Sequence, residues 1–390
     1  MRSVYGLPQA PHCAQLKLRD TILANKSFRQ TTADDCIFVS GSPTDEGFVA
    51  VGTHVDDLLT VSTPLGLSKF TTTLEKVFTI TVKRDPEIVV GVQIVRNRKA
   101  GWLKLHQAAY IDSILDTFGL TECHSEKTPL NHSTVQQLMI LPLATKETAD
   151  PGVQCQYRRL VGMLIWLYKT RPDMLFTVNL LARFLPTATK AHLTLALGRP
   201  LRYLKGSRTR GLVFVRCSPE QYFLSGNSDS DLAGDEASSR TTVGFFNRMG
   251  IYGAVSFHCS LERKICTSSQ QGETYAFCSM VKDTVWLRLL LHELGMGQKK
   301  ASLQRTDNQG VHLQSSKQVN HSGAKHFRIS QAYIRAQVNG GVILSELVRT
   351  TENGADIFTK GSISVEQFHK CMMEIMGPQD NPSLASSKTQ

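Results

Sequence analysis

Several sequence signals are missing from this chain, and their absence narrows the class of protein. No apolar run reaches the roughly 18–20 residues that a membrane-spanning helix needs, so no transmembrane segment is predicted. The opening MRSVYGLPQAPH lacks the apolar core of a secretory signal, and export is not expected. The chain also has no internal repeat and no low-complexity tract.

Cysteine is present, but the usual cysteine motifs are not. The nine cysteines form no C-x-x-C pair, and no Cys/His grouping has zinc-finger spacing. Because their number is odd and the chain is long, we expect reduced thiols and no disulfide framework, as in an intracellular protein. Cytoplasm and nucleus both stay open as locations.

Length and charge point to several domains and to a polyanionic partner. At about 150 residues per domain, 390 residues suggest two or three domains. The hydrophobic fraction of 41% can build cores, and the charged fraction of 20% is ordinary. A formal net charge of +11 favours a partner such as nucleic acid. A generally basic soluble protein is the alternative.

The spacing of apolar residues predicts a mixed α/β chain. In the first half we expect two strands within 48–63, helices at 107–118, 157–168 and 175–185, and a polar linker at 128–156. In the second half we expect strands at 212–217, 222–228, 243–257, 301–306 and 341–348, and a helix at 272–294. Strands that come first and then alternate with helices indicate an α/β layer with a mixed sheet. The chain after about residue 365 is polar, and we expect it to be frayed.

A basic run lies just before the second half of the chain. It interleaves an aromatic residue, Tyr203, with five cations, namely Arg199, Arg202, Lys205, Arg208 and Arg210. This arrangement suits contacts with a phosphate backbone. A solvated helix face explains the same pattern, and both interpretations stay open.

Four acids of the second half stand at the edges of expected elements. Asp229 follows a strand, Glu273 opens the long helix, Asp307 ends a strand and Asp356 follows the last strand. Acids at such positions can meet on one rim of a sheet, where their like charges need compensation. Two Mg²⁺ or Mn²⁺ ions supply it and promote phosphodiester cleavage. With 33 acids in the chain, chance placement is the simpler interpretation of spacing alone.

Another acid pair, Asp56 and Asp57, interrupts the apolar stretch at 48–63. Asp is common in turns, so the pair fits a tight turn between two strands. Adjacent carboxylates also fit a metal site.

These motifs, taken together, resemble the C-terminal part of the Pol polyprotein of copia-type LTR retrotransposons, reverse transcriptase followed by ribonuclease H. VYGLPQAP resembles the family's LYGLKQAP, HVDDLL its YVDDLL, and SDSDLAGD its SDADWAGD. GETYAF, TDNQG and ENGADIFTK resemble AEYxA, C-D-N-Q-S and E-D-Q-L-A-D-I-L-T-K. The resemblance runs from about residue 4 to 361.

The resemblance implies a fold, an activity and site residues. The fold is an α/β one, an α+β palm remnant followed by a ribonuclease H-like mixed sheet with flanking helices. The activity is hydrolysis of RNA in RNA–DNA hybrids with two Mg²⁺ or Mn²⁺ ions. The implied catalytic and metal-binding residues are Asp229, Glu273, Asp307 and Asp356 for the ribonuclease H, Asp56 and Asp57 for the polymerase, with Gln9 beside the incoming nucleotide.

On this basis we expect four segments and a limited set of activities. The four segments are the C-terminal half of a reverse transcriptase palm with its following segment at 1–130, a helical connection at 131–217, a ribonuclease H-like domain at 218–365 and a polar tail at 366–390. The family polymerase needs a further Asp upstream of YGLKQAP, so DNA synthesis is not expected. Partners besides nucleic acid are other Pol or Gag chains of the element. The alternative is an inert transposon relic or a nucleic-acid-binding protein.

Overall fold

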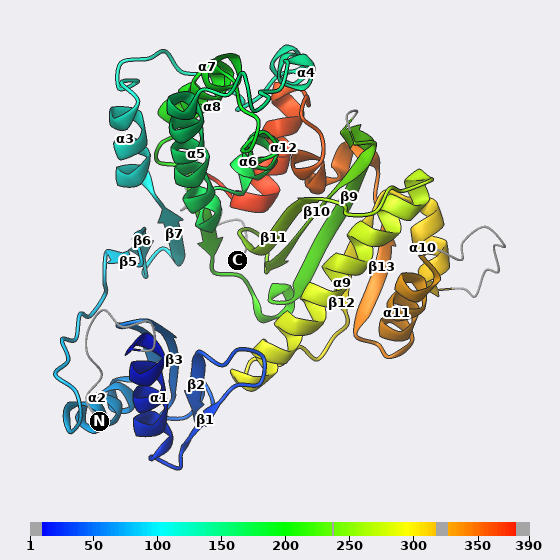
Figure 1. Ribbon diagram of the computed structural model, residues 1–390. Helices are drawn as coiled ribbons and strands as arrows, with labels where there is room; N and C mark the ends of the chain where they lie inside the picture. The colour runs from blue at the N-terminus through cyan, green and yellow to red at the C-terminus, as the bar shows by residue number, and fades with distance from the viewer. Residues whose placement is uncertain (1–9, 236–237, 317–326, 380–390) are drawn as a thin grey trace. The chain divides into compact units, whose positions relative to one another are not determined.

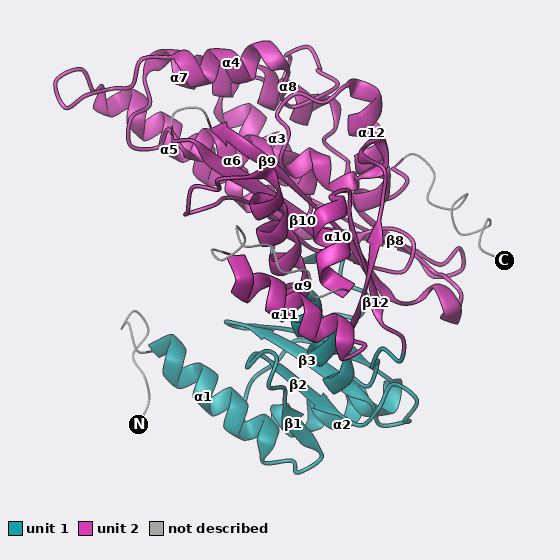
Figure 2. Cartoon of the chain, turned by 90° about the vertical axis from the view of Figure 1, so that its right-hand side faces the viewer, with its two compact units in different colours: residues 1–90, 284–299 teal, residues 91–283, 300–390 magenta. Residues whose placement is uncertain are grey.

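The computed structural model describes residues 10–235, 238–316 and 327–379, and Figure 1 shows their helices and strands. The chain divides into two compact units, coloured separately in Figure 2. The first comprises residues 1–90 and 284–299, and the second comprises residues 91–283 and 300–390. Among the described residues, no helix combines the length and the apolar character required to cross a membrane. All nine cysteines are free thiols.

The first unit is built on a four-stranded antiparallel sheet in the order β1-β2-β3-β4. Its elements are α1 Ala10–Leu23, β1 Phe28–Gln30, β2 Ile37–Ser40, β3 Val49–His54, β4 Asp57–Ser62, α2 Pro64–Glu75 and the short β5 Ile88–Val89. Val49 and Val51 of β3 pack in one core with Phe70 and Leu74 of α2. The two strands predicted within 48–63 are therefore confirmed as the hairpin β3-β4.

The second unit contains a five-stranded mixed sheet in the order β11-β10-β9-β12-β13. Strands β9, β10 and β11 are antiparallel neighbours, whereas β12 runs parallel to both β9 and β13. The elements are β9 Leu224–Asp235, β10 Arg240–Met249, β11 Ala254–Leu261, α9 Ser269–Glu293, β12 Ser302–Thr306, α10 Gln309–Ser316, α11 Arg328–Asn339, β13 Ile343–Leu347, η5 Thr350–Glu352, η6 Gly354–Phe358 and α12 Val365–Met376. The predicted mixed sheet with flanking helices is present, and the α/β fold class is confirmed.

Neighbouring phenylalanines on β10 show how both faces of this sheet are covered. Phe245 packs in a cluster with Phe277 and Met280 of α9, on the face that also carries α10 and α11. Phe246 belongs to a second cluster, in which its ring lies 6.4 Å from that of Phe358 in η6. Because successive strand residues point to opposite faces, adjacent apolar residues require a cover on each side.

Helix α12 belongs to the second of these clusters. Its buried side chains include Phe368, Cys371, Met372 and Ile375, whose spacing places them on one helical face. Ser364 caps the helix by accepting a hydrogen bond from the N–H of Gln367. The prediction that the chain is polar and frayed after residue 365 is therefore wrong for residues 365–376, because the apolar face of this helix is buried in the core.

The rest of the second unit is a helical region with a small sheet. It contains β6 Val92–Asn97, β7 Trp102–His106, α3 Ala108–Thr117, α4 His132–Ile140, α5 Pro151–Ile165, η1 Trp166–Lys169, η2 Pro172–Met174, α6 Leu175–Ala182, α7 Lys190–Leu197, α8 Arg199–Gly206, β8 Gly211–Val215 and η3 Pro219–Gln221. The predicted linker at 128–156 instead holds α4 and the start of α5. Asn131 and Asp150 cap these helices through their side chains, and Pro151 occupies the first turn of α5.

A fully buried ion pair lies at the centre of this helical region. Arg171 and Asp173 are both 0% exposed at their side chains, with Nη2 and Oδ2 2.7 Å apart. The hydroxyl of Tyr203 also donates to Asp173, and Arg171 donates to the carbonyl and hydroxyl of Ser207. Each charge therefore has several partners, which offsets the cost of removing the pair from water.

Candidate active site

The central acid of the site, Asp229, lies within β9 opposite Gly244 of β10. A Cβ on Gly244 would come within 2.5 Å of Cβ of Phe358, so glycine is what allows η6 to approach the sheet here. Asn353 joins the same two segments, because its Nδ2 donates to the carbonyl of Ser228 at 3.0 Å. The turn that carries Asp356 is thereby held beside the strand that carries Asp229.

Asp307 reaches this place through the parallel pairing of β12 with β9. The register sets Arg305 opposite Asn227, so Asp307 and Asp229 come two residues later on their respective segments. Asp307 directly follows the end of β12, whereas β9 continues past Asp229 to Asp235, so the expectation that a strand ends before Asp229 is wrong. The parallel register nevertheless brings the two acids to the same level of the sheet.

Glu273 enters the site from the first turns of α9. Its Oε1 accepts hydrogen bonds from the N–H of Ser230 at 3.2 Å and from the hydroxyl of Ser230 at 3.0 Å. Its Oε2 is buried without a hydrogen-bond partner among the described residues. A buried carboxylate oxygen that lacks a donor is costly unless a cation or a ligand satisfies it.

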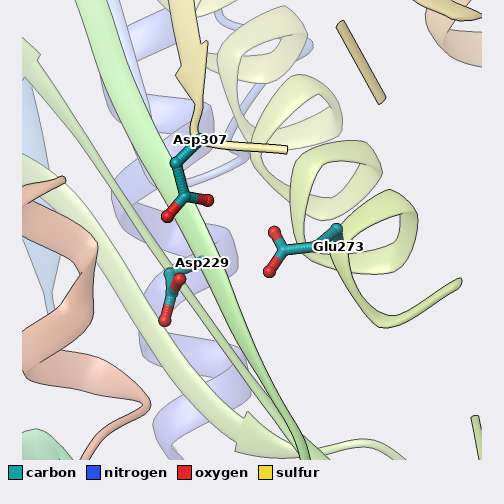
Figure 3. Close-up of side chains that lie close together, drawn as sticks. All are labelled: Asp229, Glu273 and Asp307. Atoms are coloured by element: carbon teal, nitrogen blue, oxygen red, sulfur yellow. The ribbon is translucent and has the colours of Figure 1, made fainter. Parts of the chain in front are cut away.

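Three of the predicted acids form one cluster. Ligand oxygens of Asp229, Glu273 and Asp307 all lie within 4.8 Å of one another, and Figure 3 shows the three carboxylates facing a common space. Among the described residues, no other group of His, Cys, Asp and Glu meets this criterion. Three hard oxygen ligands suit Mg²⁺ or Mn²⁺, and the unpartnered Oε2 of Glu273 gives such an ion a direct role.

The fourth predicted acid, Asp356, lies beside this cluster but is engaged by a lysine. Nζ of Lys360 lies 2.5 Å from Oδ1 of Asp356 and 3.6 Å from Oδ1 of Asp229. Thr359 donates its hydroxyl to Oδ2 of Asp229. Lys360 and Thr359 were not among the predicted site residues, although both lie in the motif ENGADIFTK.

Asp229, Glu273 and Asp356 resist ionisation when no divalent ion is bound, because their pKa values are raised. Burial raises the pKa of Asp229 to about 7, with the carboxylates of Asp356 and Asp307 adding to the rise and Lys360 opposing it. Burial and the charges of Asp229 and Asp307 raise the pKa of Glu273 to about 9. Burial also raises the pKa of Asp356. A bound cation would reverse these shifts by stabilising the ionised forms.

The acid pair of the first unit lies at the tip of the hairpin β3-β4. His54 pairs with Asp57 across the hairpin, and Val55 has a φ of 52° in the turn. Both Asp56 and Asp57 are exposed, and neither belongs to the three-acid cluster of the described residues. The position thus combines a tight turn with two solvent-facing carboxylates. Gln9, predicted beside the incoming nucleotide, lies outside the described residues.

The basic run lies on and after α8, and most of it has partners within the chain. Arg199 pairs with Glu126, Lys205 donates to the carbonyl of Thr121, Arg208 pairs with Asp112, and Arg210 donates to the hydroxyl of Tyr203. Arg202, the fifth, has a buried Nε without a hydrogen-bond partner among the described residues. With half of its side chain exposed, Arg208 is the member of these paired cations best placed to reach a phosphate.

Sequence comparisons relate nearly the whole chain to retrotransposon proteins. A family model described as reverse transcriptase (RNA-dependent DNA polymerase) matches residues 1–132. A retrovirus-related Pol polyprotein from transposon TNT 1-94 of Nicotiana tabacum is 29% identical over 97% of this chain and 28% of its own length. The Pol polyprotein from transposon RE1 of Arabidopsis thaliana is 29% identical over 92% of this chain and 24% of its own length. The chain thus spans about a quarter of these relatives.

Solved structures with a similar fold are more distant in sequence. A foamy viral protease-reverse transcriptase in complex with dsDNA is 11% identical, with a TM-score of 0.47, covering 89% of this chain and 60% of that chain. Ribonuclease H1 from Halobacterium salinarum is 17% identical, with a TM-score of 0.27, covering 35% of this chain and 92% of that chain.

Proposed function

Because nearly the whole chain resembles copia-type Pol polyproteins of retrotransposons, we propose that its C-terminal region is a metal-dependent ribonuclease H. Its substrate would be the RNA strand of an RNA–DNA hybrid. The observation that carries the proposal is the convergence of Asp229, Glu273 and Asp307 within 4.8 Å, from β9, the first turns of α9 and the end of β12. Spacing in the sequence is a weak signal for a site, whereas three buried or half-buried carboxylates in contact range are a strong one.

In this proposal Asp229, Glu273 and Asp307 hold the divalent metal. When bound, the metal stabilises negative charge on the scissile phosphate and promotes ionisation of the attacking water. The chain's own contribution is to fix the ligands. Ser230 orients Glu273 through two hydrogen bonds, and Thr359 orients Asp229 through one. Such fixed ligands need little rearrangement when the substrate arrives.

The proposed substrate follows from what the site must distinguish. A nuclease that cuts only RNA needs to detect the 2′-hydroxyl, which DNA lacks. The net charge of +11 supports binding to the phosphate backbone of a duplex. Arg208 is the proposed phosphate contact within the basic run, because its exposed pair with Asp112 exchanges readily for a phosphate.

DNA synthesis is not part of the proposal. Asp56 and Asp57 lie exposed at a hairpin tip, and the described residues place no third acid with them in a ligand cluster. A polymerase metal site requires ligands that converge on the same ions.

Cleavage of a labelled RNA–DNA hybrid by the full chain, in Mg²⁺ and in Mn²⁺, tests the proposal. The test variant is Asp307→Asn, and the matched control is Asp116→Asn, which changes an exposed acid on α3. We expect the unmodified chain and Asp116→Asn to cut only the RNA strand, and Asp307→Asn to fall to background. A folded, hybrid-binding chain that never cuts would overturn the proposal in favour of a nucleic-acid-binding protein. A chain that neither binds nor cuts would be an inert relic.

A further inference from the structure

Lys360 is placed as a cation within the carboxylate site. Its Nζ lies 2.5 Å from Oδ1 of Asp356 and 3.6 Å from Oδ1 of Asp229, between the two acids. In the ion pairs of the described residues, it is the only basic side chain that contacts any of the four predicted acids. Asp229, Glu273, Asp307 and Asp356 otherwise face one another without a positive partner.

The backbone holds Lys360 in this place. The N–H groups of Thr359 and Lys360 both donate to the carbonyl of Asp356, at 3.2 and 2.9 Å, so a tight turn links acid and lysine. Thr359, on the same turn, is tied to Asp229 by its hydroxyl. The acids that Lys360 contacts are almost completely buried, with side chains 2% and 6% exposed. The side chain of Lys360 is 33% exposed, so solvent screens these contacts only in part.

The lysine also divides the four acids into two groups. Asp229, Glu273 and Asp307 meet the distance criterion for a shared ion, whereas Asp356 does not join them and is paired with Lys360. A second divalent ion bridging Asp229 and Asp356 would need oxygens at about 2.1 Å from its centre. The ammonium already lies against those two oxygens, and a divalent ion beside it would suffer strong like-charge repulsion.

We propose that Lys360 acts as a resident cation that replaces a second metal ion in this site. The site then takes one divalent ion, held by Asp229, Glu273 and Asp307, while Lys360 neutralises Asp356 and shares Asp229. Lys360 is a positioning residue for the metal ligands. This inference rests on the proposed function, because it concerns the same metal site.

The number of Mn²⁺ ions bound by the full chain decides the question without any activity measurement. The electron paramagnetic resonance signal of free Mn²⁺ falls as ions bind, and a titration gives the number bound per chain. The background for all variants carries Asp56→Asn and Asp57→Asn, which removes the exposed acid pair of the first unit. Asp307→Asn in this background measures binding outside the site.

Three variants complete the design. Lys360→Met removes the charge with similar side-chain length, Lys360→Arg keeps a cation, and Lys264→Met removes an exposed lysine from the same unit as a charge control. We expect one tightly bound ion in the background chain, in Lys360→Arg and in Lys264→Met, and two in Lys360→Met. Circular dichroism verifies that each variant is folded.

The possible results separate this inference from the proposed function. Two ions in the background chain mean that the metal displaces Lys360, which overturns the inference and leaves the ribonuclease H proposal intact. One ion in both the background chain and folded Lys360→Met also overturns it, because no second position has been opened. If the background chain binds no more Mn²⁺ than Asp307→Asn does, the metal site itself fails and the proposed function fails with it. Should Lys360→Met not fold, Lys360→Gln, which removes the charge and keeps a polar side chain, takes its place in the same comparison.

Discussion

Thr359 donates its hydroxyl to Oδ2 of Asp229, although 130 residues separate the two in the chain. Both side chains are buried, so neither has water as a substitute partner. The contact ties η6, on one side of the sheet, to the acid at the centre of the site. The geometry of the ligand cluster therefore depends on a turn far away in the sequence.

The first prediction concerns this hydrogen bond. Thr359→Val keeps the shape of the side chain and removes the donor, so we expect the free energy of unfolding to fall by about 1–3 kcal/mol, as measured by urea denaturation. Hybrid cleavage should fall several-fold, because Asp229 loses an orienting contact. Thr359→Ser retains the hydroxyl and is the control. A loss in Thr359→Ser without a loss in Thr359→Val would show that packing of the methyl group, and not the hydrogen bond, matters.

A second prediction tests the close approach of η6 to the sheet. Gly244→Ala places a Cβ 2.5 Å from Cβ of Phe358, so either β10 or η6 must move. We expect a loss of about 1–3 kcal/mol in the free energy of unfolding, with weaker cleavage because η6 carries Asp356. Gly162→Ala is the matched control, since its Cβ meets nothing within 4 Å on the exposed side of α5. There the same change should stabilise the protein by up to about 1 kcal/mol.

The third prediction compares a buried ion pair with an exposed one. Arg171→Met leaves Asp173 charged and buried without its main partner, and we expect a loss of about 3–5 kcal/mol or failure to fold. Arg208→Met breaks a pair whose side chains are 50% and 46% exposed, and should cost about 0–1 kcal/mol. Urea midpoints of the two variants give the comparison. Similar small losses in both would mean that Asp173 becomes hydrated or protonated at little cost.

The fourth prediction is a pH dependence of stability in the absence of divalent ions. The pKa values of Asp229 and Glu273 are raised to about 7 and about 9 in the folded chain, against about 4 for free carboxyl groups. Between about pH 4 and about pH 9 the folded state therefore binds more protons than the unfolded state. The free energy of unfolding consequently falls as pH rises through this range. The slope is about 1.4 kcal/mol per pH unit for each proton of difference.

Urea denaturation in EDTA at several pH values from 5 to 9 measures this slope. Asp229→Asn removes one of the two titrating groups, so its slope should be shallower and its stability at pH 8 higher than that of the unmodified chain. Mg²⁺ should flatten the dependence as well, because it favours the ionised acids. A stability that is constant or rises over this range would contradict the raised pKa values.

Local patterns in the sequence were sufficient for the elements that position the site. Alternating apolar residues gave the hairpin β3-β4, and the order of strands and helices after residue 212 indicated the mixed sheet. The same patterns predicted Asp307 at the end of β12 and Glu273 in the first turns of α9, whereas β9 runs on past Asp229 to Asp235. Their meeting within 4.8 Å needed the register of β12 against β9, which the sequence alone does not specify.

What the sequence did not show depends on contacts between distant residues. Lys360 was part of a quoted motif, but a lysine near an acid is usually a solvated charge, and only the turn after Asp356 directs it inward. Likewise, the sequence does not distinguish Arg171 and Asp173 from other charged residues that lie near each other in the chain. Their complete burial comes from Tyr203 and Ser207, more than one helix away. The role of each predicted site residue stays a prediction until variants are measured.

Helix α9 is a single element that belongs to both compact units, with residues up to Asp283 in the second and residues from Thr284 onward in the first. Within the first unit, Glu293 accepts hydrogen bonds from the N–H groups of Thr32 and Ala33, and Nε1 of Trp286 donates to the carbonyl of Ala33. The two units therefore cannot be exchanged separately. Recombination that replaced the C-terminal half of the gene with that of a distant homologue would also replace residues 284–299, which belong to the first unit. The two halves of the gene are therefore expected to be inherited together.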